Sequence, residues 1–128
     1  MLTELQKLLK KTYTPYSKFP VAAIIKDKLG NTWQGVNVEN AAYPSGLCAE
    51  RNALFSSITY GFVPGEIKEI HILANTEEFI KPCGSCLQVM IELMDYNAEV
   101  YLYLNNGNVQ KRRLTDFLPL AFRKEFLD

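Results

Sequence analysis

All three cysteines of this 128-residue chain lie in two short segments, and their placement limits the possible folds more than any other feature. The first segment is Cys48-Ala49-Glu50, and the second is Pro82-Cys83-Gly84-Ser85-Cys86. Thiolate is a good ligand for Zn²⁺, and a Cys-x-x-Cys spacing lets one turn present two sulfurs to one ion. Structural zinc sites usually have four protein ligands, whereas catalytic sites have three and leave the fourth position for water. The cysteines therefore predict a catalytic zinc site at which the two segments meet.

Glu50, two residues after the first cysteine, is the candidate for acid–base chemistry. A carboxylate in this position could move protons to and from a water at the metal. The alternative is a zinc domain without catalytic activity, in which Glu50 would have no role. The only histidine, His71, could instead complete a structural site as a fourth ligand. A lone histidine on a predicted strand is more often packed or paired there, and we favour that interpretation.

Composition and charge narrow the class of protein and of ligand. Apolar residues make up 48% of the chain, but no run of them approaches the length of a membrane span or of a signal peptide. Lys plus Arg and Asp plus Glu both total 14, and we expect the only basic cluster, Lys111-Arg112-Arg113, at a solvated edge. We therefore expect neither a membrane nor a nucleic acid as a partner. Because three cysteines need no disulfide framework, we expect a cytoplasmic protein.

Hydrophobic periodicity predicts an alternation of helices and strands that is typical of an α/β protein. In chain order, the predicted elements are a helix over Thr3–Lys11, strands over Val21–Ile25 and Thr32–Val38, a helix over 48–60, a strand over Ile67–Ala74, a helix from Cys83, strands over Glu99–Leu104 and Val109–Arg113, and a short helix from Thr115. This order predicts one domain, residues 1–128, in which helices are layered on one mixed sheet.

Both cysteine segments fall at the beginnings of predicted helices. Cys48 and Glu50 lie in the first turn of one helix, and Cys83 and Cys86 lie in the first turn of the other. Unpaired backbone N–H groups and the helix dipole favour anions there and lower the pKa of a thiol. Arg51 could donate hydrogen bonds to the sulfurs and offset the excess negative charge of three thiolates around Zn²⁺. The commoner place for such an arginine is a solvent-facing helix surface.

Asn37 and Glu39 follow the apolar part of the second predicted strand. They are two residues apart, so in an extended chain their side chains face the same way. An amide and a carboxylate aimed into one cleft could bind a pair of sugar hydroxyls. The alternative is a polar strand end that faces solvent, which the spacing alone slightly favours.

Five separated matches, in the right order, give the chain a resemblance to the zinc-dependent nucleoside deaminases, and specifically to the small three-cysteine cytidine deaminases. Cys-x-Glu followed by Pro-Cys-x-x-Cys is a signature of zinc deaminases. The further matches are Tyr16-Ser17-Lys18-Phe19-Pro20, Asn37-Val38-Glu39-Asn40-Ala41 and Leu118-Pro119-Leu120-Ala121-Phe122. The resemblance extends over most of the chain and implies a three-layer α-β-α sandwich around one mixed five-stranded sheet.

The resemblance also implies an activity, which is the zinc-dependent hydrolytic deamination of cytidine and 2′-deoxycytidine in pyrimidine salvage. It implies a homotetramer with one zinc per subunit and with active sites shared between subunits. Glu50 would be the catalytic acid–base, and Arg51 would stabilise the thiolates. Zinc would be bound by Cys48, Cys83 and Cys86. The substrate would be bound by Phe19 at the base, by Asn37 and Glu39 at the ribose, and by Ala49. Tyr43 and Phe122 would also bind substrate, by reaching into a neighbouring subunit's site.

Two other deaminase activities are the main alternatives. A deaminase of nucleoside-like antibiotics such as blasticidin S would share the zinc signature. We expect such an enzyme to differ at the ribose-binding segment, so the presence of Asn37-Val38-Glu39-Asn40 favours an ordinary nucleoside. A deaminase that acts on bases in RNA or DNA is disfavoured by the zero net charge and the small size of the chain.

Overall fold

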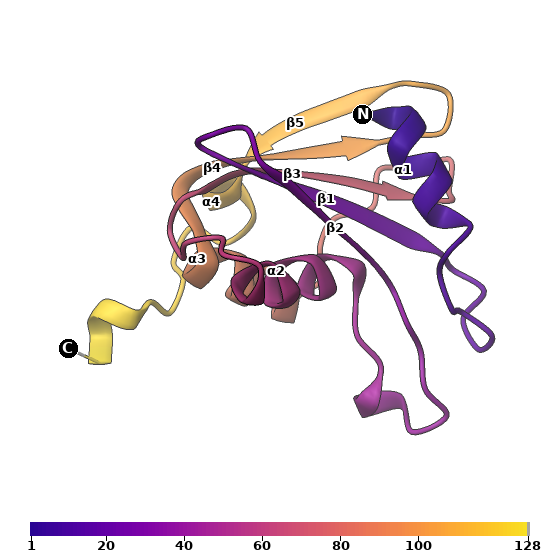
Figure 1. The fold of residues 1–128 in the computed structure, drawn as a ribbon, viewed down its shortest axis with the longest axis horizontal. Helices are drawn as coiled ribbons and strands as arrows, with labels where there is room; N and C mark the ends of the chain where they lie inside the picture. The colour runs from indigo at the N-terminus through magenta and orange to yellow at the C-terminus, as the bar shows by residue number, and fades with distance from the viewer. Residues whose placement is uncertain (128) are drawn as a thin grey trace.

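The structure, a computed structural model that describes residues 1–127, is built on one mixed five-stranded sheet (Figure 1). The strand order is β2-β1-β3-β4-β5, in which β3 and β4 pair in parallel and every other neighbouring pair is antiparallel. The strands are β1 (Val21–Asp27), β2 (Thr32–Val36), β3 (Ile67–Ala74), β4 (Met94–Tyr103) and β5 (Val109–Arg113). The sheet confirms the predicted α/β class.

The α-helices follow the predicted order, although several of their ends differ from the prediction, and the two 3-10 helices were not predicted. They are α1 (Leu2–Leu9), α2 (Ala49–Thr59), α3 (Gly84–Leu93), α4 (Leu114–Phe117) and the 3-10 helices η1 (Tyr43–Ser45) and η2 (Lys124–Leu127). Cys48 and Cys83 precede α2 and α3 as N-caps with extended backbone, rather than opening the helices. β4 begins at Met94 and not at Glu99, because Met94 already pairs with Ile67. Within residues 1–127, no helix is both long and apolar enough to cross a membrane.

Side chains on the two faces of the sheet form two separate cores, because successive residues of a strand point to opposite faces. On one face, Ile25 and Ile70 belong to the larger core, which also takes in buried residues of α2 and α3. On the other face, Leu73 packs with Leu5 and Leu8 of α1. Figure 1 shows α1 on one side of the sheet and α2 with α3 on the other. This arrangement confirms the predicted three-layer sandwich.

The strand pairing brings three chain segments to one edge of the sheet. β1 begins where β3 ends, because Val21 lies opposite Ala74 in the antiparallel register. β2 ends beside the beginning of β1, because Val36 lies opposite Ala22. The residues just before β1, just after β2 and just after β3 therefore start from the same edge, although they are far apart in the sequence.

Helix α2 lies directly against the backbone of β2 at Gly35. A Cβ atom added at Gly35 would lie 2.4 Å from the backbone nitrogen of Ala53 and 2.6 Å from the carbonyl oxygen of Ala49. A second link joins the same elements, since the Asn52 side chain donates a hydrogen bond of 2.7 Å to the Val36 carbonyl. The absence of a side chain at Gly35 thus sets how closely the N-terminal half of α2 approaches the sheet.

We predict that Gly35→Ala lowers the free energy of unfolding by about 1–3 kcal/mol, which is typical of overpacking a close contact. The methyl group would meet backbone atoms of α2, which cannot rotate away as a flexible side chain could. Chemical denaturation measures the effect. Gly84→Ala is the control, because a Cβ at Gly84 meets no atom within 4 Å and alanine favours a helix. Equal stability of the Gly35→Ala variant and the unsubstituted protein would contradict the prediction.

Candidate active site

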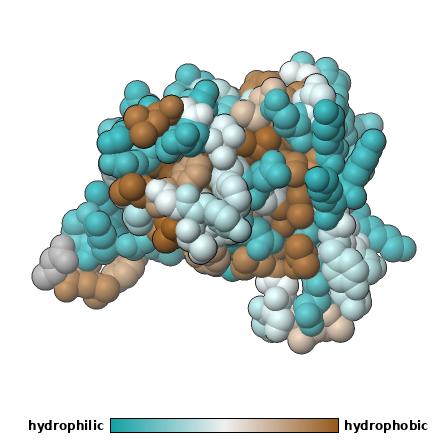
Figure 2. Space-filling view, viewed as in Figure 1, coloured by the Kyte–Doolittle hydropathy of each residue, from teal (hydrophilic) through white to brown (hydrophobic). Residues whose placement is uncertain are grey.

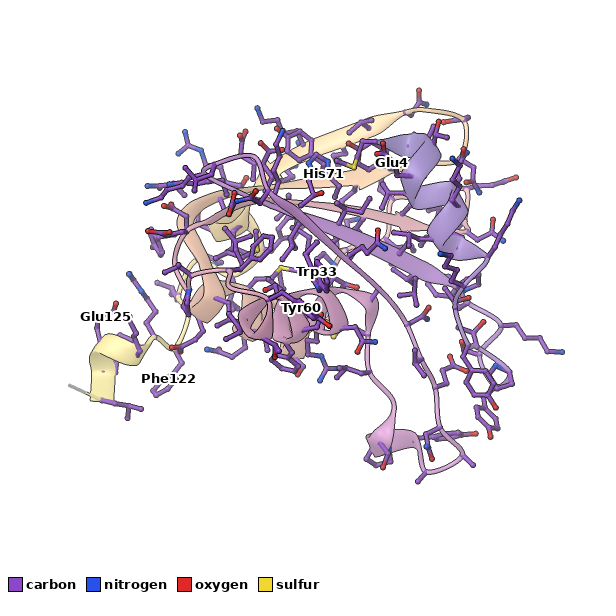
Figure 3. The ribbon with its side chains drawn as sticks, viewed as in Figure 1. Glu4, Trp33, Tyr60, His71, Phe122 and Glu125 are labelled. Carbon is purple, nitrogen blue, oxygen red and sulfur yellow. The ribbon has the colours of Figure 1, made fainter. Side chains whose placement is uncertain are left out.

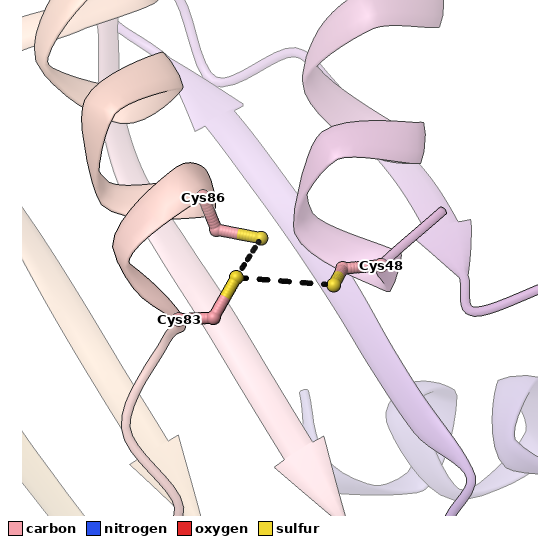
Figure 4. A group of neighbouring side chains, drawn as sticks. All are labelled: Cys48, Cys83 and Cys86. Atoms are coloured by element: carbon pink, nitrogen blue, oxygen red, sulfur yellow. Dashed lines mark hydrogen bonds between the residues drawn. The ribbon is translucent and has the colours of Figure 1, made fainter. Parts of the chain in front are cut away.

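Three sulfur atoms gather where α2 and α3 begin. Cys48 is the N-cap of α2, Cys83 is the N-cap of α3, and Cys86 lies in the first turn of α3. The Cys83 Sγ atom lies 3.3 Å from the Cys86 Sγ and 4.0 Å from the Cys48 Sγ (Figure 4). Two helix N-termini therefore direct their partial positive charge at one cluster, which favours thiolates.

The sulfur cluster fits a zinc ion in both geometry and chemistry. All three Sγ atoms lie within 4.8 Å of one another, and each cysteine is a free thiol. Tetrahedral zinc with bonds of about 2.3 Å separates its sulfur ligands by about 3.8 Å, close to the separations in this cluster. Three soft protein donors leave a fourth position for water, as in catalytic zinc sites.

His71 does not belong to the cluster, as predicted. It lies in β3 opposite Ile24, on the face of the sheet that carries α1 (Figure 3). Its Nε2 atom lies 2.8 Å from the Glu69 carboxylate, and its Nδ1 atom lies 2.7 Å from the Tyr103 hydroxyl. His71 is thus a paired histidine on the far side of the sheet from the sulfurs.

Arg51 supports negative charge on the sulfurs. Its Nη2 atom donates a hydrogen bond of 3.4 Å to the Cys48 Sγ, and its buried Nε has no acceptor within residues 1–127. The pKa of Cys48 falls to about 5, first through the hydrogen bond from Cys86 and then through Arg51. The same interaction, followed by burial, raises the pKa of Cys86 above its ordinary value. The unpaired Nε is a second donor available to a fully ionised cluster.

Glu50 combines burial with a place beside the sulfurs. The residue is 5% exposed, and its burial raises the pKa of the carboxyl above its ordinary value. It lies in the first turn of α2, two residues after Cys48, and it lines the same cavity as Cys48 and Cys83. A carboxyl whose charged form is destabilised by burial is well suited to take up and release a proton.

The cavity over Glu50 has a volume of about 400 Å³, within the range of small-molecule sites. The sequence-predicted residues that line it are Phe19, Asn37, Glu39, Cys48, Ala49, Glu50 and Cys83. Sequence reasoning missed Ser17, Val21, Ile72, Ile80 and Lys81. Ser17 belongs to the segment Tyr16–Pro20, which resembles the deaminase family, so that segment could have indicated Ser17 as a site residue. Val21 and Ile72 carry no comparable signal, because only the pairing of β1 with β3 brings them together at the cavity.

Asn37 and Glu39 both face the chain segment before β1, as well as the cavity. The Asn37 Oδ1 atom accepts a hydrogen bond of 2.9 Å from the Val21 N–H, and its Nδ2 atom donates one of 2.8 Å to the Phe19 carbonyl. Glu39 accepts hydrogen bonds from the N–H groups of Tyr16 and Ser17 and from the Ser17 hydroxyl. The bonds from Ser17 hold the pKa of Glu39 below its ordinary value. These side chains therefore organise the wall of the cavity, a role that their spacing did not predict.

Tyr43 and Phe122 occupy different positions relative to the cavity. Tyr43 is 75% exposed and lines a second cavity of about 450 Å³, which shares Asn37 and Glu39 with the first. Phe122 is 57% exposed and lines neither cavity. It lies on the projecting C-terminal segment (Figure 3), where its carbonyl accepts a hydrogen bond of 2.7 Å from Gln88. Within the described residues 1–127, the structure does not bring Phe122 to the site.

Comparison with known proteins gives a consistent family assignment. Residues 1–102 match the sequence model of the cytidine and deoxycytidylate deaminase zinc-binding region. A cytidine deaminase of Sporosarcina psychrophila is 37% identical over 127 residues, covering 99% of this chain and 92% of the relative. A cytidine deaminase of Halalkalibacterium halodurans is 40% identical over 113 residues, covering 88% of this chain and 84% of the relative. The crystal structure of cytidine deaminase from Burkholderia pseudomallei superimposes with a TM-score of 0.89 at 42% identity, covering 94% of this chain and 95% of that one.

We predict that the purified protein contains about one equivalent of zinc and that Cys83→Ala loses most of it, because binding depends on the complete set of thiolates. Elemental analysis after dialysis measures the metal content of both proteins. Ser85→Ala serves as the control, since it alters an exposed residue between two of the ligands and keeps all three sulfurs. Full zinc content in the Cys83→Ala protein would rule out the three-cysteine site.

Proposed function

This chain belongs to the cytidine and deoxycytidylate deaminase family, and on that premise we propose that it hydrolyses cytidine and 2′-deoxycytidine to uridine and 2′-deoxyuridine with release of ammonia. The usual role of this reaction is pyrimidine salvage. One observation carries the proposal, which is the buried carboxyl of Glu50 beside three clustered thiols at the wall of a ligand-sized cavity. A purely structural zinc domain has no need of that carboxyl or of that cavity.

Cys48, Cys83 and Cys86 would hold the zinc ion. Bound there, zinc supplies Lewis acidity that brings the pKa of a water molecule close to neutrality. Arg51 compensates the charge of the thiolates through its hydrogen bond to Cys48. The N-termini of α2 and α3 add two further sources of positive potential.

Glu50 carries the protons in the proposed reaction. Its carboxylate accepts a proton from the attacking water and delivers it to N3 of the pyrimidine ring, which makes C4 electrophilic. The water oxygen bonds to C4 as a hydroxyl group, and Glu50 then takes the remaining proton from that hydroxyl and passes it to the amino group. The C4–N bond breaks, ammonia leaves, and the carbonyl of the uracil ring remains. Burial supports this double use of one carboxyl, because a raised pKa keeps its two protonation states closer in free energy near neutral pH.

The cavity residues bind the substrate in this proposal. Phe19 forms a wall for the base, and the small side chain of Ala49 at the start of α2 leaves room for the ring. The carboxylate of Glu39 accepts hydrogen bonds from the ribose hydroxyls, and the amide of Asn37 lies beside it at the same part of the cavity. Both are already fixed by backbone contacts, so they lose little conformational freedom when the sugar binds.

We also propose a homotetramer in which Tyr43 and Phe122 of one subunit contact the site of another. The loop that carries Tyr43 and the C-terminal segment that carries Phe122 both project from the body of the subunit (Figure 1). Figure 2 shows hydrophobic side chains on the projecting C-terminal segment, where Leu120 is 96% exposed and Leu127 is 78% exposed. Large apolar side chains exposed together are typical of surfaces that are covered in an assembly.

The remaining parts of the proposal concern the chain as a whole. We treat residues 1–128 as a single deaminase domain, supported by the one sheet that all strands join. Three free thiols favour the reducing cytoplasm as its location. Zero net charge argues against nucleic acid as a partner and leaves a small nucleoside as the ligand.

We predict that Glu50→Gln keeps the fold and the zinc but loses about 10²–10⁴-fold or more in kcat, the range for removal of an acid–base group. The effect should fall on kcat because proton transfer occurs on the way to the transition state. Steady-state deamination of cytidine, with zinc analysis of each protein, provides the measurement. Glu92→Gln, at an exposed position of α3, is the matched control. A zinc-loaded Glu50→Gln protein that keeps more than about a tenth of kcat would assign the protons to another group.

A second prediction concerns the ribose. Glu39→Gln should raise KM for cytidine about tenfold or more, because hydrogen bonds to a charged group contribute more than neutral ones. The same steady-state assay measures it, again with Glu92→Gln as control. An unchanged KM would remove Glu39 from the sugar site. Faster turnover of blasticidin S than of cytidine by the unsubstituted protein would favour the antibiotic as substrate.

A further inference from the structure

The segment before β1 contains the one unusual backbone conformation among the non-glycine residues of the described chain. Lys18 has a φ of 55°, in the left-handed region that residues with a Cβ atom rarely adopt. Its N–H donates a hydrogen bond of 3.0 Å to the Thr14 carbonyl, which closes a tight turn. Phe19, the proposed wall for the base, follows directly. Such a conformation persists only where surrounding contacts hold it.

The contacts that hold this turn come from the proposed ribose-binding residues. The Phe19 carbonyl accepts a hydrogen bond of 2.8 Å from the Asn37 side chain. The Phe19 N–H donates one of 3.1 Å to the Ser17 hydroxyl oxygen, and the Ser17 hydroxyl in turn donates to Glu39 Oε2. The backbone of Phe19 is therefore held on both sides, and Ser17 joins one side directly to the Glu39 carboxylate.

The same contacts occupy the two oxygens of Glu39 to different extents. Oε1 accepts hydrogen bonds from the N–H groups of Tyr16, at 3.1 Å, and Ser17, at 3.0 Å. Among the described residues 1–127, the Ser17 hydroxyl is the only donor to Oε2. A carboxylate offers about two acceptor positions on each oxygen, so one position on Oε2 remains for a ligand hydroxyl. The direction of that position depends on the bond from Ser17.

We infer that Ser17 is a positioning residue that aligns the sugar-binding carboxylate of Glu39 with the base wall of Phe19. The Ser17 hydroxyl donates a hydrogen bond to Glu39 and accepts one from the Phe19 N–H. Ser17 also lines both cavities at the site. The inference rests on the proposed deaminase function and adds to it. It explains why two residues that recognise different parts of the nucleoside are linked before any substrate binds.

Ser17→Ala tests the inference in the zinc-loaded, full-length protein. The change should raise KM for cytidine about tenfold and leave kcat within about threefold, because a hydrogen bond to a charged partner contributes to binding and the chemical step does not use it. Ser17→Thr retains the hydroxyl and should recover most of the loss. In the free protein, amide exchange at the Phe19 N–H should become faster in Ser17→Ala, which reports the lost bond without any activity measurement.

A double-mutant cycle with Glu39→Gln tests whether Ser17 acts through Glu39. The KM increase of the double variant should be clearly smaller than the product of the two single increases. Ser56→Ala is the matched control, because the Ser56 hydroxyl also donates one bond, to the Asn52 carbonyl, and accepts one, from the Trp33 indole, away from the site. It should leave KM and kcat unchanged.

Any of the following results would overturn the inference while leaving the deaminase function in place: an unchanged KM in Ser17→Ala, a KM increase in the double variant equal to the product of the two single increases, or an equal KM increase in Ser56→Ala. A Ser17→Thr protein as impaired as Ser17→Ala would also overturn it, since the hydroxyl would then have no part. If the unsubstituted, zinc-loaded protein fails to deaminate any cytosine nucleoside, the proposed function fails, and the exchange rate at Phe19 still decides whether Ser17 holds the turn.

Discussion

The mutual repulsion of three closely spaced thiolates is the constraint on which the rest of the site depends. Three sulfurs within 4.8 Å of one another can be ionised together only if positive charge surrounds them. The fold supplies it by starting α2 and α3 at the same point and by placing Arg51 against Cys48. A divalent cation completes the balance. Both helices must therefore lie on the same face of the sheet with their N-termini together, and the close contact at Gly35 sets the position of one of them.

The strand order connects this charge arrangement to a place where a nucleoside can bind. Because β1 is antiparallel to both of its neighbours, its beginning meets the ends of β2 and β3. Phe19 comes just before β1 and Asn37 just after β2, so both reach the edge of the sheet beside Cys48 and Glu50. Strand topology therefore brings the proposed acid–base residue and the proposed substrate-binding residues to one cavity, and no single segment of the chain contains both.

Residues of the site also hold one another in place. Asn37 and Glu39 bind the turn that presents Phe19, and the left-handed backbone of Lys18 persists within those contacts. A site organised in this way before binding loses less conformational entropy when the ligand arrives. The burial of Glu50 fits its proposed role in the same way, since a fixed carboxyl in a poorly solvated pocket needs little reorganisation to transfer a proton.

The sequence by itself indicated zinc-dependent acid–base chemistry, because the residue types and spacings that bind a metal can be recognised within short segments. Cys48 with Glu50, and Cys83 with Cys86, indicated the metal donors and the acid–base candidate. Hydrophobic periodicity predicted the strand Ile67–Ala74 and the order of the strands and α-helices, but not the two 3-10 helices. Element ends were predicted less well, as at Met94, because pairing with Ile67 extends β4 beyond its apolar run. Only the tertiary structure decided that His71 faces away from the sulfurs and that Ser17 connects Glu39 with Phe19. These outcomes depend on strand register and on the approach of segments distant in the chain, which a local pattern does not encode.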